Sequence, residues 1–165
     1  MIQILLQNIA RFVILVLIQV LVLNNIQFLG FINPYIYVLF ILSLPVKSER
    51  WLTLILSFVL GITIDVFSNT LGLHAFACVL IGFLRDPLVK LSTTLEENVN
   101  FSPSFTTFGI ATYIKYVVIL VLVHHINLFY MEMFTFEHFW VTMYRALISF
   151  AITISIILGV QLLKR

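Results

Sequence analysis

The sequence predicts an all-α integral membrane protein: one domain over residues 1–165, folded as a compact bundle of six transmembrane helices. Its 165 residues are 62% apolar and only 10% charged, and the mean hydropathy is +1.14. A soluble domain is roughly 45–50% apolar and about 25% charged. In water, a chain this short would leave its apolar excess exposed as one large face. These values exclude an ordinary soluble protein, a disordered protein and, with a net charge of only +2, a nucleic-acid-binding protein.

Six apolar stretches are expected to form the membrane-spanning helices, since crossing a ~30 Å hydrocarbon core takes about 20 residues. Asn33 and Pro34 lie near the start of the second stretch, and Pro45 follows its end. Six such spans use roughly 120 residues, so little of the chain is expected outside the bilayer. The stretches cover residues 9–23, 31–44, 51–67, 71–84, 108–130 and 139–163.

Basic residues near the ends of these stretches predict the orientation. With six crossings they all lie on one side, because the connections at 24–30, 68–70 and 131–138 contain no Lys or Arg. By the positive-inside rule this side is the cytoplasm, so both termini are expected to be cytoplasmic. The residues that set the orientation are Arg11, Lys47, Arg50, Arg85, Lys90, Lys164 and Arg165.

The longest polar connection, residues 86–107, is expected to be a cytoplasmic linker within this domain. Asp86 and Pro87 would cap and begin a short helix. Leu88, Leu91 and Leu95 would share one face of it, which is typical of a helix lying on the membrane surface. A solvated connector is the other interpretation, because so few helical turns are marginal in water.

The third and fourth stretches predict a tight helical hairpin. From residue 51 to residue 84 the only charged residue is Asp65. These 34 residues would span about 51 Å as one helix, which is too long for one crossing and short for two crossings plus a turn. Non-helical backbone at membrane depth must face protein or a wet cavity. Ser68, Asn69 and Thr70 would supply local hydrogen bonds, and Gly72 would take the positive φ of the turn.

Asp65 is the sharpest candidate site residue, because an intramembrane carboxylate by default marks a functional site with a partner. The alternative is that Asp65 lies at headgroup level and caps the turn. Gly61, one turn away on the same face, would allow a neighbouring helix to approach closely. Arg145 lies at a similar outer depth in the last stretch, so an Asp65–Arg145 ion pair is expected. Lys115 is expected to extend to the cytoplasmic headgroups.

Three histidines also lie in the outer half of the expected bundle: His74, His124 and His125. A metal site built from Asp65, His74 and one of the other two is conceivable, but hydrogen-bonded histidines are the expectation. No catalytic motif is present, so we expect no enzymatic activity, no cofactor and no metal. The expected partner- or ligand-binding site is an outer-half polar cluster of Asp65, Asn69, Gly72, His74 and Arg145.

The hairpin sequence resembles the family of the rod shape-determining protein MreD. The resemblance rests on Gly61-x-x-x-Asp65-x-Phe67, followed by Gly72-Leu73-His74-Ala75 and an apolar run that ends at Arg85. The stretch from Asn24-Asn25-Ile26 to Asn33-Pro34-Tyr35 is also similar to the family. In length and span layout the resemblance covers essentially the whole chain.

The resemblance implies a non-enzymatic component of the bacterial inner (cytoplasmic) membrane. Such proteins act with MreC, a single-span protein, and with an elongasome built around MreB filaments, RodA and a penicillin-binding transpeptidase. They help to organise lateral peptidoglycan synthesis and so maintain rod cell shape. Their six-helix arrangement is similar to that of the substrate-binding subunits of vitamin transporters. A substrate-binding membrane subunit of a small-molecule transporter is therefore the alternative, with the outer polar cluster receiving either a partner segment or a solute.

Overall fold

The computed structural model describes residues 2–26, 32–92, 101–133 and 138–163, and its regular elements are helical, as the sequence predicts. Among these residues, four helical segments are long and apolar enough to cross a membrane. They are Leu6–Leu23, Arg50–Ser68, Ile110–Met133 and Phe139–Leu163. Their composition marks the chain as a membrane protein.

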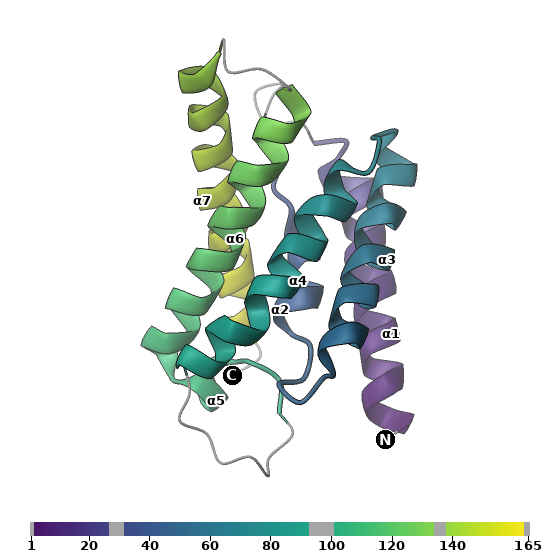
Figure 1. Cartoon of the computed structure of the whole chain (residues 1–165), viewed down its shortest axis with the longest axis vertical. Coiled ribbons are helices and arrows are strands. Elements are labelled where there is room, and N and C mark those ends of the chain that lie inside the picture. Colours follow the sequence, from purple (N-terminus) through teal and green to yellow (C-terminus); the bar gives the residue numbers. More distant parts are fainter. Residues whose placement is uncertain (1, 27–31, 93–100, 134–137, 164–165) are drawn as a thin grey trace.

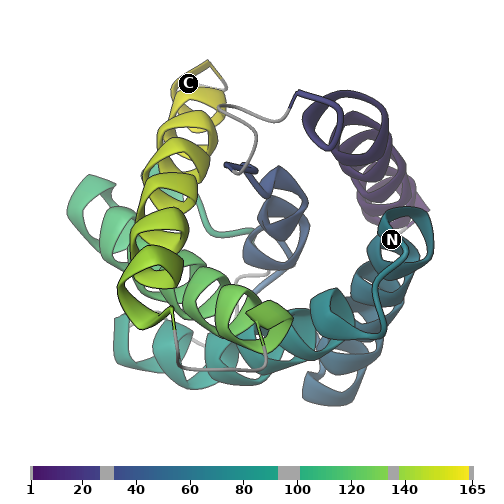
Figure 2. The same cartoon turned by 90° about the horizontal axis from the view of Figure 1, so that it is seen from above.

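Long helices form a ring around a short central helix, which is seen best along the bundle axis (Figure 2). Helix α1 ends in a π-helical segment, η1, and is followed by the short central elements η2 and α2. The connection between α4 and α6 carries one further short helix, α5. The bounds are α1 Ile2–Leu17, η1 Ile18–Leu23, η2 Ile36–Val38, α2 Leu39–Leu42, α3 Arg50–Ser68, α4 Leu73–Ser92, α5 Phe105–Phe108, α6 Ile110–Met133 and α7 Phe139–Leu163 (Figure 1).

The second expected span is not a full membrane helix. Residues 36–42 are helical, and their side chains are buried inside the ring rather than facing lipid. Pro34 disfavours helix at the residue before it, and Pro45 lies just past the helix end. Seven helical residues rise only about 10–14 Å, so this helix alone is too short to cross the ~30 Å core. The apolar stretch is therefore core, which its length of about 14 residues already favours.

Side chains of the ring helices form hydrogen bonds with the backbone at the N-terminal end of the central segment, residues 34–36. Gln19, fully buried on η1, accepts from the Ile36 N–H at 3.0 Å and donates to the Pro34 carbonyl at 3.1 Å. On the opposite wall, Thr153 Oγ1 of α7 accepts from the Tyr35 N–H at 3.0 Å. Because lipid offers no hydrogen bonds, these side chains make the non-helical backbone tolerable at this depth.

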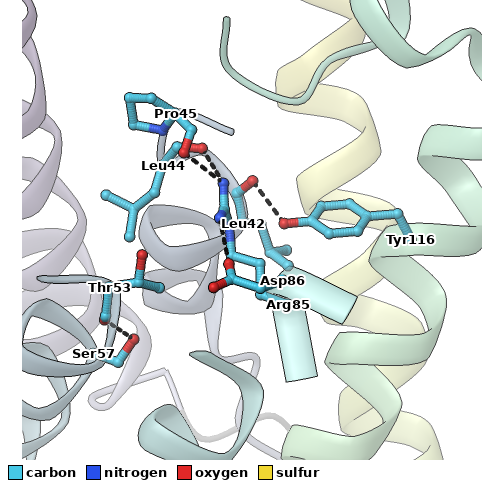
Figure 3. A network of polar contacts seen from close by, with 8 residues as sticks. All are labelled: Leu42, Leu44, Pro45, Thr53, Ser57, Arg85, Asp86 and Tyr116. Atoms are coloured by element: carbon cyan, nitrogen blue, oxygen red, sulfur yellow. Dashed lines mark hydrogen bonds and ion pairs between the residues drawn. The ribbon is translucent and has the colours of Figure 1, made fainter. Parts of the chain in front are cut away.

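Arg85 performs the same task where the central segment leaves. Its guanidinium is fully buried on α4, and Nη2 donates to the carbonyls of Leu44 and, at 3.1 Å, Pro45 (Figure 3). Nη1 lies 3.3 Å from Oδ1 of Asp86, which forms an ion pair with it. Arg85, one of the basic residues on which the predicted orientation rests, is therefore buried inside the protein, where it donates to the carbonyls that follow α2.

Two further side chains complete this end of α2. The Tyr116 hydroxyl of α6 donates to the Leu42 carbonyl at 3.1 Å (Figure 3). Arg11 Nη1 of α1 donates to the Ser43 carbonyl at 3.0 Å. Together with the bonds from α4, these contacts give each carbonyl from residue 42 to residue 45 a donor from the ring.

Helix α4 continues through the start of the expected linker. We expected one helix to end at residue 84 and another to begin at Asp86 and Pro87, but α4 runs unbroken to Ser92 with Pro87 inside it. A proline there removes one backbone hydrogen bond, while the buried contacts of Arg85 keep the helix in place.

The described end of the linker packs against the bundle rather than standing in solvent. Ser104 caps α5 by accepting from the Thr107 N–H at 3.2 Å, and Phe105 and Phe108 are buried. Leu95, predicted on a surface helix with Leu88 and Leu91, lies outside the described residues.

We predict that Arg85→Met lowers the free energy of unfolding by about 3–5 kcal/mol, because it leaves Asp86 and buried carbonyls without their donor. The measurement is chemical unfolding in detergent micelles. Lys90→Met, an exposed position on the same helix, is the matched control. Equal stability of the two variants would contradict the capping role of Arg85.

Candidate functional site: a polar outer cavity above a buried tyrosine–histidine core

The expected hairpin forms between α3 and α4, with a turn over residues 69–72. Asn69 adopts the left-handed conformation, with φ 55° and ψ 43°, and Gly72 has φ 82°. The positive φ of Gly72 is the one that the sequence predicts, while Asn69, predicted only to supply local hydrogen bonds, is a second left-handed position. The two helices make the most extensive contact between any pair of elements described.

Asp65, on α3, connects the two helices of the hairpin through hydrogen bonds to the turn and to the start of α4. Its Oδ1 accepts from the His74 N–H at 3.0 Å and from the Thr70 hydroxyl at 2.5 Å, while Oδ2 accepts from the Ala75 N–H at 2.9 Å. The carboxylate is 1% exposed and lies at the N-terminus of α4, where the helix dipole favours an anion. The structure thus shows that Asp65 caps the turn and the start of α4.

Gly61 provides the close approach that the sequence predicts. A Cβ atom at this position would lie 2.3 Å from Cα of Ala75 and 2.6 Å from the carbonyl oxygen of His74. Backbone atoms cannot yield to it, so only glycine fits here. Gly61 thus sets the distance between α3 and α4. Asp65, one turn later, sets how far the two helices are shifted along each other.

Arg145 lies apart from this arrangement on α7. Its guanidinium carbon is 5.5 Å from the centre of the Phe129 ring of α6. The bonds described for the Asp65 carboxylate are all to its own hairpin, and the expected pair with Arg145 is not among them.

A cavity of about 380 Å³ opens beside the hairpin tip, at the end of the bundle expected to face outward. Of the predicted site residues, His74 lines it, Asp65 lies behind the wall, and Asn69 and Gly72 belong to the turn. Among the described residues of the lining, Glu132 is the only acid, which favours neutral or cationic groups. The lining residues are Val20, Asn24, Asn25, Asn33, Tyr35, Phe67, Ser68, Thr70, Leu73, His74, Leu128 and Glu132.

The rim of this cavity is cross-linked by amides. Gln19 Nε2 donates to Asn24 Oδ1 at 2.9 Å, and Asn24 Nδ2 donates to the Ser68 hydroxyl at 3.1 Å. The end of η1 is thereby fixed to the end of α3. Among the described residues, the buried Asn33 Oδ1 has no hydrogen-bond partner, so the lining retains an acceptor for a polar guest.

Beneath the cavity, a buried tyrosine joins two histidines. The Tyr37 hydroxyl lies 2.7 Å from Nδ1 of His74 and 2.9 Å from Nε2 of His124. One hydroxyl proton serves one imidazole, so the other must donate its N–H to the tyrosine oxygen. In the described part of the chain Nδ1 of His124 has no hydrogen-bond partner. Burying Nδ1 as an unpaired acceptor costs less free energy than burying it as an unpaired N–H donor, so the proton is expected on Nε2. We therefore assign Nε2–H of His124 as donor to Tyr37, and Tyr37 as donor to His74.

The remaining histidine belongs to the adjacent wall. His125 Nδ1 donates to the Val121 carbonyl at 2.8 Å, and Nε2 lies 3.0 Å from Thr153 Oγ1. The ring of Tyr35 lies between the histidines, with its centre 5.4 Å from that of His74 and 5.5 Å from that of His125. No group of three or more His, Cys, Asp or Glu residues in the described ranges is arranged to hold a metal ion.

Sequence reasoning missed the residues that connect cavity and core. Gln19 is the one polar side chain between residues 12 and 23, which was a signal for a buried hydrogen bond. The run Asn33-Pro34-Tyr35-Ile36-Tyr37 places two tyrosines after a proline, but only the tertiary structure reveals that the helix they begin lies inside the ring.

No family model matches the chain, and no match was found among curated proteins or solved structures.

We predict that Gly61→Ala destabilises the fold by about 1–3 kcal/mol, since the added methyl group must push α3 and α4 apart. Gly159→Ala is the control, because a Cβ there meets no atom within 4 Å. Unfolding of both variants in the same detergent tests this. A Gly61 variant as stable as the Gly159 variant would refute the close contact.

We predict that Tyr37→Phe costs about 1–3 kcal/mol, because it leaves buried imidazole nitrogens of His74 and His124 without a partner. Tyr144→Phe, at an exposed tyrosine of α7, should be nearly neutral. Thermal unfolding of the two purified variants distinguishes them. A Tyr37 variant that matches the Tyr144 variant would show that the hydroxyl does not bridge the histidines.

Proposed function

We propose that the chain is an MreD-type, non-enzymatic component of the bacterial cell-elongation machinery. In this proposal it crosses the inner membrane six times, binds an MreC-like single-span protein and helps to organise lateral peptidoglycan synthesis. MreB, RodA and a penicillin-binding transpeptidase are the wider partners, and maintenance of rod cell shape is the outcome.

The hairpin is the observation that carries this proposal. The residues on which the resemblance rests, Gly61, Asp65, His74 and Ala75, form one packed and hydrogen-bonded unit. This unit supplies one wall of the outer cavity. The residues of the motif therefore have defined structural roles in this chain. A chance similarity between apolar sequences would not require them to contact one another.

The chain path supports six crossings with both termini on one side. In Figure 1 the N-terminus, the connection from α2 to α3 and the end of α4 lie toward one end of the bundle. The α3–α4 turn lies at the other end, as do the end of α6 and the start of α7. The central segment makes the second crossing as a short helix with non-helical flanks, which is allowed because it is buried in protein.

The cavity suits recognition of a partner with a single transmembrane helix. So little of the chain lies outside the expected membrane region that a partner must be bound through spans and short connections. A polar, outward-facing cavity beside the bilayer can receive the short polar segment that follows such a helix. Amide side chains of Asn25 and Asn33 and the Glu132 carboxylate offer donors and acceptors for that segment.

The same cavity keeps the transporter subunit as a second candidate. A volume of about 380 Å³ with mostly polar lining also fits a small hydrophilic solute. This candidate requires a solute that co-purifies with the protein and an energising ATPase subunit. The scaffold proposal requires neither.

Photo-cross-linking in growing rod-shaped cells tests the proposal. A photoreactive residue at Asn25 or Glu132, both on the cavity lining, is expected to trap an MreC-like single-span protein. The control position is Phe58, an exposed apolar residue of α3. Depletion of the chain is expected to round the cells. Cross-links to cytoplasmic proteins alone would overturn the orientation, and a co-purifying solute without a protein cross-link would favour the transporter subunit.

A further inference from the structure

A second, apolar cavity lies between α1 and α7, away from the outer polar site. Its volume is about 610 Å³, and it is open at the side of the bundle. Ile36 and Leu39 of the central segment form its back wall, so the cavity is a notch between two helices of the ring. Figure 2 shows α1 and α7 on either side of the central helix. The lining residues are Gln7, Ala10, Arg11, Ile14, Leu15, Ile18, Ile36, Leu39, Ile156, Ile157 and Val160.

Hydrogen bonds close the outer end of this notch. Gln19, one residue beyond the last lining residue of the first helix, is bonded to the backbone of residues 34 and 36. Thr153 on α7 is bonded to the N–H of Tyr35 in the same segment. These bonds connect η1 and α7 through residues 34–36 of the central segment. On the side of these residues toward the N-terminus of α1, the notch separates α1 from α7.

The notch therefore reaches through only part of the membrane. Along α1 and the first residue of η1 it extends from Gln7 to Ile18, which is about 16 Å at a rise of 1.5 Å per residue. That is about half of a ~30 Å hydrocarbon core, or the depth of one leaflet. A partner's transmembrane helix needs a surface across the whole core, whereas an acyl chain of one leaflet needs only this depth.

Charge identifies the headgroup. Of the lining residues that the structure describes, Arg11 alone is charged, and it lies toward the N-terminal end of the notch, opposite the polar bridge. Its Nη1 atom donates to the Ser43 carbonyl and, at 3.4 Å, to Asn8 Oδ1. A guanidinium carries five N–H donors in a planar fork, which suits phosphate oxygens. An apolar slot with an arginine at its membrane-surface end is complementary to a phospholipid that carries a net negative charge.

We propose that the notch binds an anionic phospholipid of the cytoplasmic leaflet. One acyl chain lies between α1 and α7 against Ile36 and Leu39, and the phosphate lies on Arg11. The leaflet assignment rests on the orientation in the proposed function, whereas the site itself does not depend on an MreC-like partner. Bound in this way, the lipid completes the wall of the ring where the two protein helices separate.

Native mass spectrometry of the full purified chain tests this. Phosphatidylglycerol and phosphatidylcholine with the same acyl chains are titrated separately into the detergent solution. The wild-type protein is expected to retain phosphatidylglycerol preferentially. Arg11→Gln should weaken phosphatidylglycerol binding about tenfold, the size of one charge-assisted hydrogen bond, and remove the preference.

A steric variant keeps the test independent of the structural role of Arg11 at Ser43. Ala10→Phe places a ring in the notch and is expected to abolish retention of the lipid. Val13→Phe is the matched control, since Val13 is exposed on the same helix and does not line the notch.

Three results would overturn the proposal: equal retention by the Ala10 and Val13 variants, equal retention of both lipids by the wild type, or a cross-link from Ile14 to a helix of another chain. Because the titration contains no partner protein, its outcome is separate from that of the cross-linking at Asn25.

Discussion

The structure depends on keeping every backbone polar group hydrogen-bonded in a solvent that offers no hydrogen bonds. Most of the chain meets this constraint with long helices, but the central segment does not. Its helix covers only residues 36–42, so both of its ends leave carbonyls and N–H groups at membrane depth. Gln19 and Thr153 satisfy one end, and Arg85, Tyr116 and Arg11 satisfy the other. These five polar side chains therefore have a structural reason to lie within or beside the spans.

The two cavities follow from that central segment. Above it, the loss of helix at Pro34 exposes Tyr35 and Asn33 to the outer cavity, whose floor is His74. Below the same level, α1 and α7 contact the segment rather than close upon each other, which leaves the apolar notch. A polar site and an apolar site thus lie on opposite sides of one hydrogen-bonded layer. The lining of the first is mostly polar, and that of the second is mostly apolar.

Sequence patterns predicted the long apolar helices and the hairpin, because hydropathy and the turn chemistry of Gly72 act locally. They failed where a sequence buried inside the protein has the same apolar composition as a sequence that faces lipid. An apolar run flanked by Pro34 and Pro45 reads as a span in either case, and only its shortness distinguished it. Arg85 near a helix end reads as an interfacial residue unless its carbonyl partners, far away in sequence, are known. The contact of Tyr37 with two histidines is likewise a property of the tertiary fold.

The order in which the central segment acquires its partners has a consequence for biogenesis. Residues 32–46 are synthesised before Arg85, Tyr116 and Thr153, the later residues that hydrogen-bond to their backbone. Until those residues are in place, part of the backbone at both ends of the segment has no hydrogen-bond partner, so placing it among lipid is costly. We therefore expect the segment to reach its final position only after the later helices have been made. Chains cut short before α7 would lack Thr153 and would present an unfinished core to membrane proteases.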